Sequence, residues 1–213
     1  PIPEKKIALL KKIEGLKIDP IILAELDIVA KRLEDSGWII EEPEAPNFQE
    51  AAKFQATLWL GEFRRTGGEA ITKENDPDSN FIYSQMSRRC PDTSLEKFMD
   101  SLQQRARISR EWNKFFDQHP IILCPITGDI PFPDLKDLES EESFDLVFDS
   151  MLPQIAPPYM GLPGLSFATS QTKQNIPLGV QFISRKFRED LLLNVAYDLE
   201  NYYPKIEPVL PSF

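Results

Sequence analysis

The sequence predicts an α/β protein in which helices cover a mixed β-sheet, and four stretches carry that prediction. Residues 161–169 and 175–184 each combine large or branched side chains with a preceding Pro or Gly, which indicates two buried neighbouring strands. Residues 121–125 (IILCP) form a continuous apolar run, typical of the middle of a sheet that is covered on both faces. Residues 19–41 show a helix pattern that leads across Gly37 into a strand, which is half of a crossover unit.

Composition limits the classes of function. The 213 residues are 41% hydrophobic, which is enough for one α/β unit over residues 1–213. The formal net charge is −10 and no cluster of five basic residues occurs, so we expect no nucleic-acid partner. No apolar run approaches 18 residues and no signal-peptide pattern is present, so we expect no membrane partner.

The cysteines bear on the cellular compartment, and the first residue bears on whether the chain is part of a longer polypeptide. Cys90 and Cys124 are too few for a disulfide framework or a zinc site, and they suit a reducing compartment, so the expected location is cytoplasmic. Because the chain begins with Pro1 and not with Met, we expect that it was cut from a longer polypeptide or engineered.

The first elements follow from local signals. Residues 6–10 (KIALL) are a short apolar run that predicts a strand. Asp19 is the expected N-cap of a helix with Pro20 at its first position, and Gly37 ends it before a strand over residues 38–41. The apolar stripe of this helix comprises Ile22, Leu26, Val29 and Leu33.

The middle of the chain predicts two longer helices. Asn47 can cap a helix that continues to about Phe63, and residues 67–80 are polar and rich in turn formers, which predicts an exposed connection. Thr93 and Glu96 fit a capping box before a helix over residues 95–118. The expected apolar faces are Phe48, Ala52, Gln55 and Trp59 for the first helix, and Leu95, Phe98, Leu102, Ala106, Trp112 and Phe116 for the second.

Two further helices are expected. Residues 134–149 are acidic and predict a solvated helix, since they lack the Asp/Asn alternation and the central Gly of a calcium loop. Residues 189–201 have apolar side chains at helical spacing and can cover one face of the sheet.

The residues by themselves predict no catalytic group, no metal site and no cofactor. His119 is the only histidine and fits the C-terminal end of a helix. Residues 164–168 (GLSFA) half-resemble a nucleophile elbow, but the second Gly is missing and His119 precedes Ser166, whereas the base of an elbow follows its serine. Cys124 lies in an apolar run, where inert packing is expected.

Four strings, in order, resemble the C-terminal half of the amidase signature family, whose members hydrolyse carbon–nitrogen amide bonds. Residues 177–181 (PLGVQ), followed by LLLNVAYDLE, are similar to a strand and Leu-rich helix of the family, and residues 161–166 (GLPGLS) are similar to its Gly-x-Pro-Ala-x-Ser run. Residues 110–127, with an Arg, aromatic residues and the string IILCPIT, and the helix–strand step of residues 19–41 resemble two further segments. The resemblance implies an incomplete portion of the amidase signature fold.

The resemblance also implies what this sequence lacks. The nucleophilic serine of the family, a second serine and a lysine kept neutral by burial lie in the N-terminal half. This sequence has no Ser-Ser pair, so no catalytic residue is carried over and the chain alone is expected to be inactive. The implied partners are the N-terminal half of the same polypeptide and a small amide substrate, and loss of that half would expose apolar surface that permits self-association.

Site residues follow from the same resemblance, because the C-terminal half of the family completes the sheet and supplies the acyl side of the substrate pocket. Tyr159 stands where the family usually has Asn, and both pocket lining and plain core packing remain open for it. Gln181 is expected to act as a hydrogen-bond strut for a neighbouring loop. The pocket candidates are Ile126, Thr127, Tyr159 and Met160, and the structural motif residues are Gly161, Pro163, Gly179 and Gln181.

Two alternatives stay open. One is a subunit of the amidotransferase type within the same family, although the acidic balance and the absence of an RNA-binding surface count against it. The other is a non-catalytic binding or scaffold module derived from this fold.

Overall fold

A mixed five-stranded sheet forms the centre of the molecule, in a computed structural model that describes residues 5–91 and 94–203. The strand order is β2-β1-β3-β5-β4, with parallel pairing on the β2–β1–β3 side and antiparallel pairing on the β3–β5–β4 side. This arrangement confirms the predicted α/β class with a mixed sheet. The strands are β1 (Lys6–Leu9), β2 (Ile39–Glu41), β3 (Ile121–Pro125), β4 (Gly164–Gln171) and β5 (Pro177–Ser184).

The N-terminal part is a β1–α1–β2 crossover, as the sequence predicts. Helix α1 (Pro20–Asp35) begins where the Asp19 carboxylate accepts a 2.7 Å hydrogen bond from the Ile21 N–H. It ends before Gly37, whose positive φ of 83° suits a residue without a Cβ. The chain then returns through β2 parallel to β1.

Strand β3 lies in the middle of the sheet, and all five of its residues are buried. This confirms the interpretation of the IILCP run. Of the two C-terminal strands, β5 is almost entirely buried between β3 and β4. The expectation that both are buried is wrong for β4, because β4 is the outer strand and its alternate residues, among them Ser166 and Ala168, are exposed.

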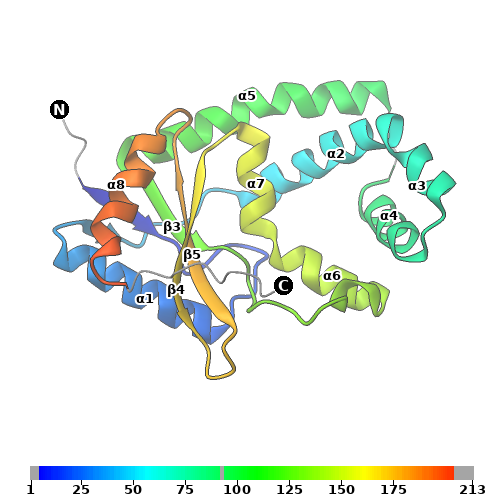
Figure 1. The fold of residues 1–213 in the computed structure, drawn as a ribbon. Coiled ribbons are helices and arrows are strands. Elements are labelled where there is room, and N and C mark those ends of the chain that lie inside the picture. Colours follow the sequence, from blue (N-terminus) through cyan, green and yellow to red (C-terminus); the bar gives the residue numbers. More distant parts are fainter. Residues whose placement is uncertain (1–4, 92–93, 204–213) are drawn as a thin grey trace.

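Helices cover both faces of the sheet (Figure 1). Helices α1 and α8 (Glu189–Glu200) pack on one face, where Leu26, Val195 and Phe182 are fully buried in one core cluster. Helices α2 (Phe48–Thr66), α5 (Leu95–Gln118) and α7 (Leu152–Met160) pack on the other face, in a cluster that includes Trp112 and Tyr159. The predicted helix at the C-terminal side is confirmed, with Leu192, Val195 and Leu199 buried.

A group of shorter helices lies beyond this second face, at the right of Figure 1. It comprises α3 (Gly68–Glu74), α4 (Pro77–Arg89), the 3-10 turn η1 (Lys136–Leu138) and α6 (Glu141–Ser150). The prediction of a connection over residues 67–80 is wrong, because α3 and the first turn of α4 occupy it. Helix α4 begins where the Asp76 carboxylate accepts a 2.8 Å hydrogen bond from the Ser79 N–H, and Pro77 follows the cap.

The long helix α5 has the predicted bounds but a different buried face. Its N-cap is Ser94, which accepts a 3.2 Å bond from the Lys97 N–H, while the expected cap Thr93 lies outside the described residues. Leu95 is 76% exposed and Leu102 is 38% exposed, contrary to the prediction, because the first half of α5 extends past the sheet (Figure 1). The residues that α5 buries are Ser101, Ile108, Trp112 and Phe116.

Helix α2 also differs from its predicted face. Trp59 is 55% exposed, whereas Leu58 and Leu60 are buried. Helix α2 contacts α7, α5 and α3, so a single apolar stripe does not describe it. None of the helices in the described part of the chain combines the length and apolar character needed to cross a lipid bilayer.

Candidate functional site

The C-terminal end of β3 carries the first two predicted pocket residues. Ile126 and Thr127 are half-buried, and the Thr127 hydroxyl donates a 2.6 Å hydrogen bond to the Asp129 carbonyl. Gly128 joins this loop to two helices, since its carbonyl accepts from the Asp19 N–H and its N–H donates to the Ser150 carbonyl, both at 2.8 Å. A Cβ at Gly128 would collide with the backbone of the segment before α1, so only glycine fits there.

The end of α7 carries the other two predicted pocket residues, and both are buried. Tyr159 is 0% exposed and its ring stacks on Phe54 of α2 at 5.7 Å between centroids. Its hydroxyl donates to the Ser101 carbonyl of α5, and the Arg105 guanidinium lies 5.4 Å from the ring centroid. Burial raises the pKa of the Tyr159 hydroxyl, so the phenol stays protonated and acts as a packed hydrogen-bond donor.

The four structural motif residues have clear local roles. Gly161 ends α7 with a φ of 66°, and a Cβ at Gly179 would lie 2.8 Å from the Phe167 carbonyl oxygen of the neighbouring strand. The Pro163 carbonyl accepts a 3.3 Å bond from the Ser184 N–H. Gln181 donates a 3.0 Å bond to the Pro153 carbonyl in the first turn of helix α7, whereas the sequence suggested a neighbouring loop as its partner.

Two cavities are described below, and neither is lined by Ile126, Thr127, Tyr159 or Met160. Tyr159 and Met160 are core residues in this structure, whereas Ile126 and Thr127 lie in a partly open loop. Their place in a substrate pocket therefore stays a prediction.

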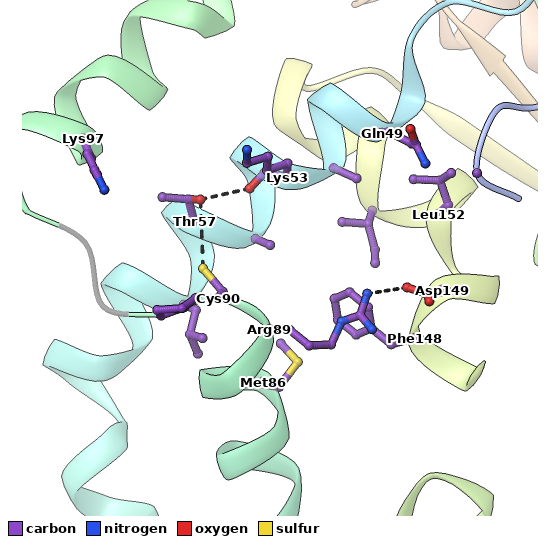
Figure 2. A pocket seen from close by; sticks show the side chains of 16 residues that line it. Gln49, Lys53, Thr57, Met86, Arg89, Cys90, Lys97, Phe148, Asp149 and Leu152 are labelled. Carbon is purple, nitrogen blue, oxygen red and sulfur yellow. Dashed lines mark hydrogen bonds and ion pairs between the residues drawn. The ribbon is translucent and has the colours of Figure 1, made fainter. Parts of the chain in front are cut away.

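A cavity of about 500 Å³ lies between α2, α4, α6 and α7, and we call it the polar cavity (Figure 2). Apolar side chains form much of its wall, including Ala52, Ala56, Leu60, Met86, Leu152 and Ile155. Its polar groups are Gln49, Lys53, Thr57, Arg89, Cys90, Lys97 and Asp149. An apolar wall with a few convergent polar groups is the usual composition of a small-molecule site.

One ion-pair cluster fixes the α4 side of the polar cavity. Arg89 bonds to Asp145 at 2.6 Å and to Asp149 of α6, and its guanidinium lies 4.5 Å from the Phe148 ring centroid. Burial alone would raise the pKa of Asp145, but the hydrogen bonds from Arg89 and Arg88 outweigh it and hold the pKa below its ordinary value. Arg89 is therefore a neutralised anchor between α4 and α6.

Two other cations of the polar cavity are unpaired. Lys53 and Lys97 have no ion-pair partner among the described residues, although both line the cavity. Thr57 and Cys90 lie between them, with the Thr57 hydroxyl donating to the Lys53 carbonyl at 3.0 Å (Figure 2). The free ammonium groups give this cavity a positive rim that favours carbonyl oxygen or carboxylate groups.

No pattern in the sequence indicates this cavity. Its lining comes from segments that are far apart in the chain, and α4 fell partly in the stretch predicted to be a connection. One signal was available, because Asp76-Pro77 repeats the cap-and-proline pattern of Asp19-Pro20.

The comparison with known families decides the family. The family model described as Amidase matches residues 3–193. This chain belongs to the amidase family. The match confirms the resemblance shown by the four sequence strings.

The relatives of this amidase-family chain are longer proteins. It is 27% identical over 197 residues to an indoleacetamide hydrolase of Bradyrhizobium diazoefficiens, which covers 92% of this chain and 37% of that protein. It is 31% identical over 108 residues to a glutamyl-tRNA(Gln) amidotransferase subunit of Desulforapulum autotrophicum, which covers 51% of this chain and 21% of that protein. The chain thus spans well under half of the length of these relatives.

Solved structures show the same fold. A 6-aminohexanoate cyclic dimer hydrolase superposes with a TM-score of 0.75 at 16% identity, covering 93% of this chain and 45% of that one. A glutamyl-tRNA(Gln) amidotransferase subunit of Thermotoga maritima superposes with a TM-score of 0.64 at 21% identity, covering 95% of this chain and 43% of that one. At these identities the likeness concerns the fold alone.

The two candidate nucleophiles of this amidase-family chain, Cys124 and Ser166, are not activated by a base within the part of the chain that the structure describes. Burial raises the pKa of the fully buried Cys124 thiol to about 12, so it is not a thiolate at neutral pH. Ser166 is exposed on the outer strand β4 and has no side-chain hydrogen bond in the described part of the chain. His119 caps α5 and bonds to the Glu41 carboxylate at 2.8 Å. Across residues 5–91 and 94–203, no group of three His, Cys, Asp or Glu residues could hold a metal ion.

Proposed function

We propose that this chain is the C-terminal part of an amidase-type hydrolase that acts on carbon–nitrogen bonds of small linear or cyclic amides. In this role the chain completes the sheet and the acyl side of the substrate pocket, and it does not supply the catalytic groups. The observation that carries the proposal is the amidase-family match over residues 3–193 in a chain whose candidate nucleophiles, Ser166 and Cys124, lack an activating base among the described residues. Hydrolysis of an amide bond needs such an activated nucleophile.

The polar cavity is the part of this chain that we assign to the substrate. Its volume of about 500 Å³ suits a small molecule, and its apolar wall suits the acyl group of an amide. Lys53 and Lys97 at its rim can donate to a carbonyl or carboxylate oxygen. From the resemblance we also propose Ile126, Thr127, Tyr159 and Met160 as residues of the acyl pocket, and none of these four lines the polar cavity itself.

The proposed partners are the N-terminal half of the same polypeptide and a small amide. Leu95, Met99 and Leu102 lie at helical spacing on α5 and are 76%, 47% and 38% exposed, which leaves an apolar face for such a half to cover. Without that cover, we expect the 213-residue chain to self-associate in a sedimentation experiment. A strictly monomeric species would count against this assignment.

A first experiment tests whether the chain is catalytic alone. The folded 213-residue chain, checked by circular dichroism, is incubated with a panel of small linear and cyclic amides, and released ammonia or amine is measured. We expect no release above the buffer rate. Turnover that disappears in a Ser166→Ala variant would overturn the proposal in favour of a serine nucleophile in β4.

A second experiment tests the substrate pocket in the longer polypeptide. The proposal predicts that the reading frame upstream of Pro1 encodes a lysine and a Gly- and Ser-rich loop, and the absence of such a loop would contradict it. In a polypeptide with that loop, Ala56→Phe should lower kcat/KM about tenfold or more, because the ring fills the polar cavity. The matched control Ala24→Phe, at an exposed position of α1 outside the polar cavity, should leave kcat/KM within about twofold.

The relatives also favour a second candidate, an amidotransferase-type subunit. Its support is the 31% identity over 108 residues to such a protein. The net charge of −10 argues against direct RNA contact, so we expect no salt-dependent tRNA binding in a gel-shift assay. Ligand binding in the polar cavity with no turnover, even in the longer polypeptide, would instead support a non-catalytic binding or scaffold module.

A further inference from the structure

A second cavity of about 500 Å³ lies between α2, α3, α4 and the loop around η1, and we call it the apolar cavity. Its wall is formed mainly by large apolar and aromatic side chains, among them Trp59, Phe63, Ile82 and Tyr83. Phe63 and Tyr83 pack edge to face at 5.9 Å between centroids, so this wall is ordered by its own contacts. The indole of Trp59 is 55% exposed, and an exposed aromatic ring at a cavity is a ready contact surface for a ligand.

Two carboxylates, from separate segments of the chain, also line this apolar cavity. Asp78 lies in the first turn of α4 and Asp137 lies in η1. Neither side chain has an ion pair or hydrogen bond among the described residues. The nearest lysine in sequence, Lys136, is already paired with Glu139. Two unpaired carboxylates, of which Asp78 is exposed and Asp137 is partly buried, therefore line a site whose remaining lining is mainly apolar.

We propose that the apolar cavity binds a small molecule with an aromatic or branched apolar body and one protonated amino group. The apolar body would be buried against Phe63 and Ile82, which removes apolar surface from water. The ammonium group would pair with Asp78 and Asp137 and lie against the Trp59 ring, where a cation is attracted to the aromatic face. A neutral analogue forgoes these interactions, and an anionic analogue is repelled.

This site is separate from the polar cavity and does not depend on the proposed amidase function. The two cavities share only Leu60 and Met86 as wall residues. The unpaired Lys53 and Lys97 repel a cationic ligand from the polar cavity. Binding of a cationic amine to the chain therefore indicates binding in the apolar cavity.

The tryptophans allow a direct test. The folded 213-residue chain is titrated with 2-phenylethylamine at a concentration where sedimentation shows a single species, and the three indole N–H signals are followed by two-dimensional NMR. We expect a saturable shift of the Trp59 signal, while Trp38 and Trp112, which are 6% and 2% exposed, act as internal controls. The neutral analogue 2-phenylethanol should bind about tenfold more weakly, since it lacks the ion pairs and the cation–aromatic contact.

Matched variants locate the charge that is recognised. The double variant Asp78→Asn/Asp137→Asn should lose the preference for the amine over the alcohol, and it should still fold because the N-cap of α4 is Asp76. Asp134→Asn, on an exposed aspartate of the same loop outside the lining, should change nothing. Trp59→Leu should weaken both ligands while leaving the circular dichroism spectrum unchanged. The absence of a saturable Trp59 shift, equal affinities for amine and alcohol, or an amine preference that survives the double substitution would each overturn the proposal.

Discussion

The two cavities have the same volume of about 500 Å³ and share a wall, yet their chemistry is opposite. The polar cavity has Lys53 and Lys97 unpaired at its rim, whereas the apolar cavity has two unpaired carboxylates and aromatic walls. Helix α2 explains the difference, because it presents Lys53 and Thr57 to one side and Trp59 and Phe63 to the other. Residues four apart lie on the same face of a helix, as Lys53 and Thr57 do, and as Trp59 and Phe63 do. The second pair is rotated around the helix axis from the first, so the two pairs line different cavities.

The largest effect on stability is expected at Leu60, in the wall that the two cavities share. Leu60 is 3% exposed and separates the two cavities, so Leu60→Ala should lower the free energy of unfolding by about 2–4 kcal/mol, because the lost side chain enlarges existing cavities. Urea unfolding followed by circular dichroism measures this change.

The control for that substitution is Leu95→Ala on α5. Leu95 is 76% exposed, so we expect a change within about 0.5 kcal/mol. A loss below about 1 kcal/mol for Leu60→Ala would mean that the wall between the cavities rearranges freely.

The sheet and its two flanking helices α1 and α8 could be predicted because the apolar residues of each element are buried against a single neighbouring layer. The apolar run 121–125 and the stripe of α1 meet the sheet directly, so local periodicity and burial agree. The strand β4 shows the limit of this reasoning, since its apolar composition does not reveal that no strand pairs with its outer side in the described part of the chain.

The helices around the cavities could not be predicted in the same way. The apolar residues Leu95 and Leu102 of α5 have helical spacing but lie where the helix extends past the sheet. Periodicity alone therefore predicts a buried face at positions that are exposed. Both cavities are formed by residues that the tertiary fold brings together, and no spacing in the sequence joins Lys53 to Arg89 or Trp59 to Asp137. The Asp76-Pro77 cap was the one local signal that could have located α4.

The ion pairs beside the polar cavity predict that the stability effect of a substitution at Arg89 depends on pH. Arg89→Met removes one of the two arginines that hold the pKa of Asp145 low, and should cost about 1 kcal/mol at about pH 7. A carboxyl with a lowered folded-state pKa contributes stability above its unfolded pKa, about 3.9, and loses this contribution as the pH falls through the folded value. The deficit of the variant should therefore be full at neutral pH and shrink below about pH 4.

The measurement is urea unfolding of both proteins between about pH 2 and about pH 7. Arg89→Lys, which keeps the charge, should recover part of the deficit. A deficit that is constant over this pH range would show that Arg89 acts through packing on Phe148 and not through the carboxylates.

The smallest effect on the free energy of unfolding is expected at the apolar cavity, because substituting one of its carboxylates leaves no Lys or Arg side chain without its ion-pair partner. Asp137→Asn should change the free energy of unfolding by no more than about 0.5 kcal/mol, because the Asp137 carboxylate has no partner among the described residues. Asp145→Asn, in the ion-pair cluster beside the polar cavity, should cost more, since it leaves Arg88 and Arg89 with fewer acceptors. The same urea series measures both variants, and a larger loss for Asp137→Asn than for Asp145→Asn would show that Asp137 is held by the protein itself and is not available to a ligand.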